Sequence, residues 1–172
     1  DGVLLIDGAL HIYFESGALN FETSGLYAVE RNTRQNFPGL GDAQRDGQYF
    51  FPSPVAQTSY TLWDPFYIGP QSVSFDHTET LGGLRVYVFT FAVKDLNETD
   101  GYSYLMNVPE QYLAHSNAEG TIWVEPLSGI VVDYADQGVS SFIDPASQEL
   151  IADFNTWNNT YTPETRAAQL AL

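Results

Sequence analysis

The 172-residue sequence contains no cysteine. This absence excludes disulfide bonds, zinc sites built on thiolates and catalysis by a thiol nucleophile. Long apolar runs are missing too, since no stretch approaches the ~18–20 residues that a membrane-spanning helix needs. The residues themselves therefore predict neither a disulfide framework nor a membrane span.

Basic side chains are scarce. Six Lys and Arg residues stand against 22 Asp and Glu, the formal net charge is −16, and Lys94 is the sole lysine. Such a charge argues against binding nucleic acid or an anionic lipid surface, because both require a basic protein surface. It favours a hydrated, self-repelling surface. We therefore expect an extracytoplasmic protein with an acidic surface; a protein from a salt-adapted organism is the alternative.

Aromatic residues are abundant, at 15% of the chain, and hydrophobic residues reach 44%. This length and content predict one folded domain over residues 1–172, and the aromatic residues favour strands. Short apolar or alternating runs bounded by Gly, Pro, Asn and Asp recur along the chain. The predicted strands are Val3–Ile6, Leu10–Phe14, Leu26–Glu30, Ser59–Trp63, Ser72–Thr78, Leu84–Val93, Thr121–Glu125, Ile130–Tyr134, Ser140–Ile143 and Glu149–Phe154.

The connections between these strands carry turn signals. Asp7-Gly8 predicts a hairpin or bulge, and Leu81–Leu84, which contains Gly82 and Gly83, predicts a tight turn. Pro126–Gly129 and Asp144–Ser147 predict hairpins. Residues 32–48 are polar and glycine-rich and predict a long loop. Leu84–Val93 is apolar on both faces, which is typical of a central strand covered on both sides.

Helix signals are few. Pro109–His115 predicts one or two helical turns. At the end of the chain, Thr162 is a capping residue, Pro163 takes the first helical position and Glu164 complements the helix dipole. The predicted fold class is mostly β, with an antiparallel sheet that forms a curved half-barrel or a sandwich, a C-terminal helix and little other helix.

Several segments resemble a family of membrane-anchored actinobacterial proteins, the PorA-like family, whose domain has no assigned function. Val29–Thr33 only approximates a further element of that family, an Asp-Arg-Arg-Thr-like sequence. The segments that carry the resemblance are Asp46–Pro52 with Ser59–Pro65, Gly83–Phe89, Thr121–Val132 and Tyr161–Thr165.

The resemblance implies a single extracytoplasmic domain between two membrane helices, one upstream of Asp1 and one after Leu172. We expect a non-catalytic cell-surface domain that acts in recognition or assembly, with the membrane and possible envelope subunits as partners and no nucleic acid. One alternative is the ligand-binding input domain of a transmembrane receptor such as a histidine kinase, with the helix from Pro163 transmitting the signal. Another is a lipid or lipoprotein carrier, with a cavity lined by Phe89, Phe91, Val86 and Val88.

The densest aromatic cluster of the sequence lies between residues 49 and 67, beside Asp64. Exposed aromatic rings next to a carboxylate are typical contacts of carbohydrate or cationic ligands, although packing into the core is the other interpretation. The candidate ligand-binding residues are Tyr60, Trp63, Asp64, Phe66 and Tyr67.

Metal sites have little support in the sequence. The loop from residue 95 to 101 offers Asp95, Asn97 and Asp100 as calcium ligands, but its spacing misses the EF-hand pattern by one residue. Apart from possible calcium, no cofactor is expected. His11 and His115 are too far apart in the sequence to form a ligand motif.

Three further features of the sequence support predictions: one histidine, the lack of enzyme motifs and two glycosylation sequons. The alternation in residues 72–78 places His77 on one face with Val73 and Phe75, as a half-buried, hydrogen-bonded histidine. Hydrolase and nucleotide-binding motifs are missing, so we expect no enzymatic activity. Asn97 and Asn158 lie in glycosylation sequons, which matter if the source glycosylates its proteins.

Overall fold

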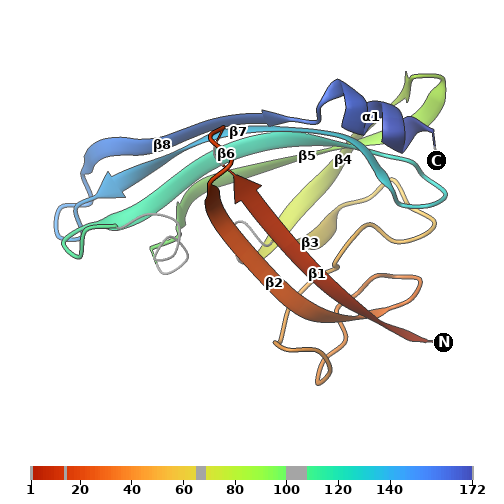
Figure 1. The fold of residues 1–172 in the computed structure, drawn as a ribbon, viewed down its shortest axis with the longest axis horizontal. Helices are drawn as coiled ribbons and strands as arrows, with labels where there is room; N and C mark the ends of the chain where they lie inside the picture. Colours follow the sequence, from red (N-terminus) through yellow and green to blue (C-terminus); the bar gives the residue numbers. More distant parts are fainter. Residues whose placement is uncertain (1, 14, 65–68, 100–107, 172) are drawn as a thin grey trace.

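The computed structural model describes residues 2–13, 15–64, 69–99 and 108–171. It contains two antiparallel sheets, one of two strands in the order β1-β2 and one of six strands in the order β3-β4-β5-β6-β7-β8. The six strands form an open, arched layer (Figure 1), so the predicted mostly-β fold is confirmed. The strands are β1 (Val3–Tyr13), β2 (Leu19–Glu30), β3 (Tyr60–Asp64), β4 (Gly69–Leu81), β5 (Leu84–Asn97), β6 (Leu113–Val124), β7 (Val131–Ile143) and β8 (Leu150–Thr160).

The N-terminal hairpin differs from its prediction. Asp7 and Gly8 lie inside one continuous strand, paired with Leu26 and Gly25 of β2, and the irregularity of β1 comes at Ile12/Tyr13 instead. The glycine serves close packing, because a Cβ atom on Gly8 would lie 2.9 Å from the Tyr49 hydroxyl. In Figure 1 this hairpin crosses below the six-stranded sheet.

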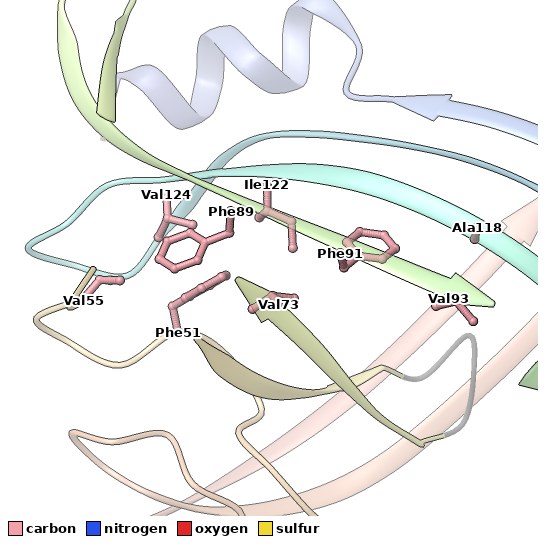
Figure 2. Packing of buried hydrophobic residues seen from close by; sticks show 9 residues of the cluster. All are labelled: Phe51, Val55, Val73, Phe89, Phe91, Val93, Ala118, Ile122 and Val124. Carbon is pink, nitrogen blue, oxygen red and sulfur yellow. The ribbon is translucent and has the colours of Figure 1, made fainter. Parts of the chain in front are cut away.

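The core lies between the large sheet and the segment that connects β2 to β3. Phe51 and Val55 of that segment are buried against Phe89 of β5 and Val73 of β4 (Figure 2). The Phe51 and Phe89 ring centroids are 4.7 Å apart. The buried members of the cluster are Phe51, Val55, Val73, Phe89, Phe91, Val93, Ala118, Ile122 and Val124.

Strand β5 is an interior strand that is covered on both faces, as predicted. Val86 and Val88 are buried on one face, while Phe89 and Phe91 are buried on the other. These four side chains therefore cannot line a single cavity, and the lipid-carrier cavity expected between them is not formed. Phe89 is instead covered by the Phe51 ring.

Two glycines of the large sheet make room for aromatic rings from neighbouring strands. A Cβ atom on Gly120 of β6 would lie 2.4 Å from the Phe91 ring, and one on Gly138 of β7 would lie 2.2 Å from Trp157. The Trp157 Nε1–H group donates to Asp136 Oδ2 at 2.6 Å. Small residues in β6 and β7 thus let Phe91 and Trp157 lie flat on the face that carries the core.

Strand β4 contains a bulge that places His77 on the face opposite to the predicted one. The register shifts between Phe75 and His77, so His77 pairs with Val88, on the face opposite to Phe75 and Val73. The predicted face is therefore wrong, whereas the predicted hydrogen bond forms, and the side chain is 51% exposed. Nδ1 of His77 donates to Asp76 Oδ2 at 2.8 Å, and this hydrogen bond raises the pKa of His77.

The two helix predictions have different outcomes. Residues 109–112 form a single turn, closed by the Tyr112 N–H donating to the Pro109 carbonyl, and β6 begins at Leu113, so the predicted helix there is wrong. Helix α1 (Pro163–Leu170) forms as predicted, with Thr162 accepting from the Thr165 N–H. It has eight residues, and the described part of the chain holds no helix capable of spanning a membrane.

Candidate functional site

An aromatic hollow lies beneath the large sheet, between β3 and the start of β7. Its volume is about 170 Å³. Trp63 and Asp64 of the predicted ligand-binding set line it, together with apolar residues of β5, β6 and β7. The lining residues are Tyr49, Phe50, Phe51, Leu62, Trp63, Asp64, Gln71, Val73, Phe91, Ile122, Val131, Tyr134 and Tyr161.

A second hollow, of about 470 Å³, adjoins the first and reaches from β1 to α1. Phe50, Phe51, Val131 and Tyr161 line both hollows, so we treat the two as one cleft. Segments from both ends of the chain meet in it. The second hollow is lined by Leu4, Ile6, Arg34, Phe50, Phe51, Ser128, Gly129, Ile130, Val131, Tyr161 and Gln169.

The remaining members of the predicted ligand-binding set have other positions. Tyr60 packs in the core, 5.5 Å from the Phe51 ring and 5.8 Å from the Phe89 ring. Its hydroxyl accepts from the Ala56 N–H at 2.7 Å, which makes it a structural residue. Phe66 and Tyr67 lie outside the described residues.

Arg45 supports the wall of the cleft next to Trp63. Its guanidinium lies 4.0 Å from the centre of the Tyr27 ring and 6.0 Å from that of Trp63. It also pairs with Asp42 at 2.5 Å, and this hydrogen bond lowers the pKa of the Asp42 carboxyl. Arg45 is therefore occupied in holding the segment between β2 and β3 against the hairpin.

The hydroxyls of Tyr49 and Tyr161 in the cleft remain neutral at physiological pH, because the pKa of each is raised. Burial raises the pKa of Tyr49, with a further contribution from Tyr27. Burial also raises the pKa of Tyr161, and the charge of Asp133 adds to it. The cleft thus combines apolar rings with neutral hydroxyl groups, one carboxylate and one guanidinium.

Several residues of the cleft cannot be recognised as site residues from the sequence. The sequence predicts a strand for Leu4 and Ile6 and a helix for Gln169, with no sign of a site at any of them. Arg34 carried no signal, because the left-handed backbone that it adopts (φ 59°) is not recognisable from its residue type. Tyr161 appeared only as part of a segment shared with the PorA-like family.

A carboxyl group lies buried near the same face of the sheet. Glu98 is 7% exposed, and its Oε2 atom has no hydrogen-bond partner among the described residues. Burial raises its pKa, a hydrogen bond from Ser116 opposes that shift, and the charge of Asp64 adds to it. The Ser116 hydroxyl is itself bonded to that of Ser140 at 2.8 Å. Glu98 is therefore destabilising when it is ionised.

We expect the substitution Glu98→Gln to stabilise the protein at pH 7. Since the pKa of Glu98 is higher in the folded than in the unfolded state, the folded state loses stability as pH rises above about 4.5. Removing the charge should raise Tm by roughly 2–4 °C, the equivalent of about 1 kcal/mol. Thermal unfolding at pH 7 and pH 3.5 measures this, and the difference should vanish at the lower pH.

The exposed Glu15 offers a matched control for that experiment. Glu15→Gln makes the same change of charge without removing a buried carboxyl group, so its Tm should match that of the unsubstituted protein at both pH values. A loss of stability in Glu98→Gln at pH 7 would show that the ionised carboxylate is stabilising and would refute our interpretation.

The candidate calcium ligands have partners of their own. Asp95 Oδ1 accepts from His115 Nδ1 at 2.6 Å, and Asn97 Oδ1 accepts from the Thr99 N–H and hydroxyl at 3.0 and 2.7 Å. Asp100 lies outside the described residues. Within those residues, no group of three or more His, Cys, Asp or Glu side chains is placed to hold a metal ion.

The three histidines lie on three different strands, each beside a carboxylate. His11 faces Glu22 across the β1–β2 hairpin at 3.3 Å, whereas His77 and His115 pair with Asp76 and Asp95. The sequon residues Asn97 and Asn158 are both exposed, at the end of β5 and on β8. Their modification stays a prediction.

A wider hollow, of about 680 Å³, lies on the other face of the large sheet. It owes its depth to short side chains in adjacent strands, among them Ser74, Thr90, Ala92, Thr121 and Ala135. Its described lining contains one aromatic residue, Phe91, and no basic side chain, whereas the cleft has several aromatic walls and an arginine, so the cleft is the better candidate for a binding site.

Comparison with known proteins agrees with the sequence resemblance. A family model described as porin PorA matches residues 23–172. No individual protein of curated function matches the chain. The matched region begins within β2 and contains most of the cleft, but it leaves out β1 with Leu4 and Ile6. The match indicates a protein of the cell envelope.

Proposed function

Because the chain belongs to the porin PorA family, we propose that it is a non-catalytic, extracytoplasmic domain of a membrane-anchored envelope protein. Its role is recognition or assembly at the cell surface, with membrane helices outside this chain and envelope subunits as partners. The observation that carries the proposal is the cleft, an apolar site that solvent reaches. Phe50, which lines both hollows, is 52% exposed.

The surface supports this assignment. A net charge of −16 suits a domain that stays hydrated outside the cytoplasm and does not bind nucleic acid. A non-catalytic role is consistent with the described lining of the cleft, which contains no histidine to act as a general base. Recognition through exposed aromatic side chains is consistent with the enrichment of aromatic residues at binding surfaces.

The absence of cysteine allows a direct test in intact cells. Leu127, at 77% exposure in the β6–β7 turn, would be changed to Cys in the full-length protein and treated with a membrane-impermeant maleimide. We expect equal labelling before and after lysis. Ala114→Cys, at a fully buried position, is the control for folding, and the unsubstituted protein gives the background. Labelling of Leu127→Cys only after lysis would refute the extracytoplasmic location.

A second substitution tests recognition at the cleft. Phe50→Cys should react more slowly in intact cells than in the purified protein, because a bound partner covers the cleft. Leu127→Cys, outside the cleft, should react equally in both settings. If the ratio of the labelling rates of Phe50→Cys and Leu127→Cys were the same in cells and in the purified protein, the cleft would not be occupied in cells, contrary to the proposal.

A sensor domain is the second candidate, and one observation favours it. Gln169 of α1 and Tyr161, two residues before α1, line the second hollow. A ligand in the cleft would therefore touch the helix that leads to the end of the chain. Hydrogen exchange of the α1 amides with and without a bound ligand would distinguish this role, since a sensor requires a ligand-dependent change there.

A further inference from the structure

Arg34 is the one basic side chain among the described residues that line the cleft. Arg45 and Arg166 pair with Asp42 and Asp133, but no carboxylate of the described residues lies within 4.0 Å of the Arg34 guanidinium. Its Nη1 group donates to the Arg31 carbonyl. A guanidinium carries five N–H donors, so most of its donors remain for a ligand.

The backbone holds Arg34 in a conformation that an arginine rarely adopts. Its φ of 59° lies in the left-handed region, which disfavours side chains other than Gly, Asn and Asp. Two backbone hydrogen bonds hold it there. The Arg34 N–H donates to the Glu30 carbonyl at 2.9 Å, and the Tyr49 N–H donates to the Arg34 carbonyl at 2.9 Å. These two bonds fix the backbone from which the Arg34 side chain reaches the second hollow.

The rest of the second hollow is mainly apolar and extends from β1 to α1. Leu4 and Ile6 line it on one side, Ile130 and Val131 on another, and Phe50 at its junction with the first hollow. An apolar hollow of this kind suits an aliphatic chain, and a single guanidinium suits an anionic group attached to that chain.

We propose that the cleft binds a single-chain anionic amphiphile of the fatty-acid class. The aliphatic chain lies along Leu4, Ile6 and Val131, and the carboxylate accepts hydrogen bonds from Arg34. The inference rests on the proposed recognition function and names its ligand.

Because the protein is strongly acidic, the sign of the charge on a bound amphiphile shows whether a local cation takes part in binding. At a net charge of −16, the field of the protein attracts cationic amphiphiles and repels anionic ones. Affinity for an anion therefore requires a local cation. A preference for the anionic amphiphile cannot result from the general field or from nonspecific adsorption to apolar surface.

The test compares three amphiphiles of equal chain length with the purified protein, each below its micellar concentration or, for the alcohol, below its solubility limit. Laurate, dodecanol and dodecyltrimethylammonium would be titrated while tryptophan fluorescence, which includes that of Trp63 in the first hollow, is recorded. We expect laurate to bind about tenfold more tightly than the other two. Equal affinity for the three, or a preference for the cation, would overturn the proposal.

Substitutions locate the binding. Arg34→Asn removes the charge and retains a residue that tolerates positive φ, and it should weaken laurate binding about tenfold while leaving dodecanol unaffected. Arg85→Asn makes the same change of charge at an exposed arginine outside the cleft and should have no effect. Phe50→Ala should weaken the binding of every amphiphile.

The variants separate failure of this inference from failure of the proposed function. If Phe50→Ala weakens binding but Arg34→Asn does not, the cleft recognises apolar chains and the anionic ligand is refuted. If no amphiphile binds, this inference is overturned, whereas the reactivity of Phe50→Cys in cells still tests recognition at the cleft by itself.

Discussion

Phe51→Ala should cost about 3–5 kcal/mol of the free energy of unfolding, the range for removing a buried phenylalanine. Phe51 is 1% exposed, and its ring contacts those of Phe89 and Tyr60. It belongs to the segment between β2 and β3, so the loss would leave a void on the face of the sheet and release that segment. Since domains unfold at about 5–15 kcal/mol, the variant should be close to the limit of folding. Urea unfolding measures the change.

Phe50→Ala is the matched control, because it removes the same side chain from the neighbouring residue. Phe50 is 52% exposed and contacts Tyr49 with a centroid distance of 4.3 Å. Its removal should cost less than about 1.5 kcal/mol, since the ring is only partly withdrawn from water. If both variants lost the same stability, the burial of Phe51 would not be what holds the segment between β2 and β3 against the sheet.

The elements that could be predicted from the sequence are those set by local chemistry. Gly82 and Gly83 adopt positive φ in the turn between β4 and β5, Gly129 does so in the β6–β7 turn, and Thr162 caps α1. Each of these residues determines the conformation of its own neighbourhood.

The predictions that were wrong concern residues whose conformation is determined by distant contacts. Asp7-Gly8 carries a turn signal, yet Gly8 lies in a strand paired with Gly25 of β2, and its missing side chain leaves room for the Tyr49 hydroxyl. Residues 113–115 form the end of the helical turns predicted for Pro109–His115, yet they pair with Ile143, Phe142 and Ser141 of β7. Tertiary pairing overrides local preference in both cases.

The candidate site could be predicted only in part, for the same reason. The density of aromatic residues identified Trp63 and Asp64, which lie in one short strand. The opposite walls come from Leu4 and Gln169, near the two ends of the chain. Only the fold brings such residues together, and no spacing in the sequence encodes their proximity.

An ion pair links α1 to β7, and Leu170 of α1 lies beside Gly82 in the turn between β4 and β5. Arg166 Nη2 lies 2.7 Å from Asp133 Oδ2, and Asp133 is 4% exposed. Helix α1 has no buried residue of its own. Arg166→Met should therefore cost about 3 kcal/mol, because it leaves a buried carboxylate without its partner. Urea unfolding measures the loss, and hydrogen exchange should show that the α1 amides lose protection first.

The double variant Arg166→Met with Asp133→Asn tests whether the buried charge is the cause. With both charges removed, most of the lost stability should return, since no unpaired ion remains in the sheet. The α1 amides should stay unprotected, because the neutral pair no longer holds the helix. Asp133 is the residue before Tyr134, and Arg166 lies three residues before Gln169. Tyr134 and Gln169 both line the cleft. A helix that stays protected in both variants would show that its position does not depend on this pair, and a signal from the cleft would then need another route.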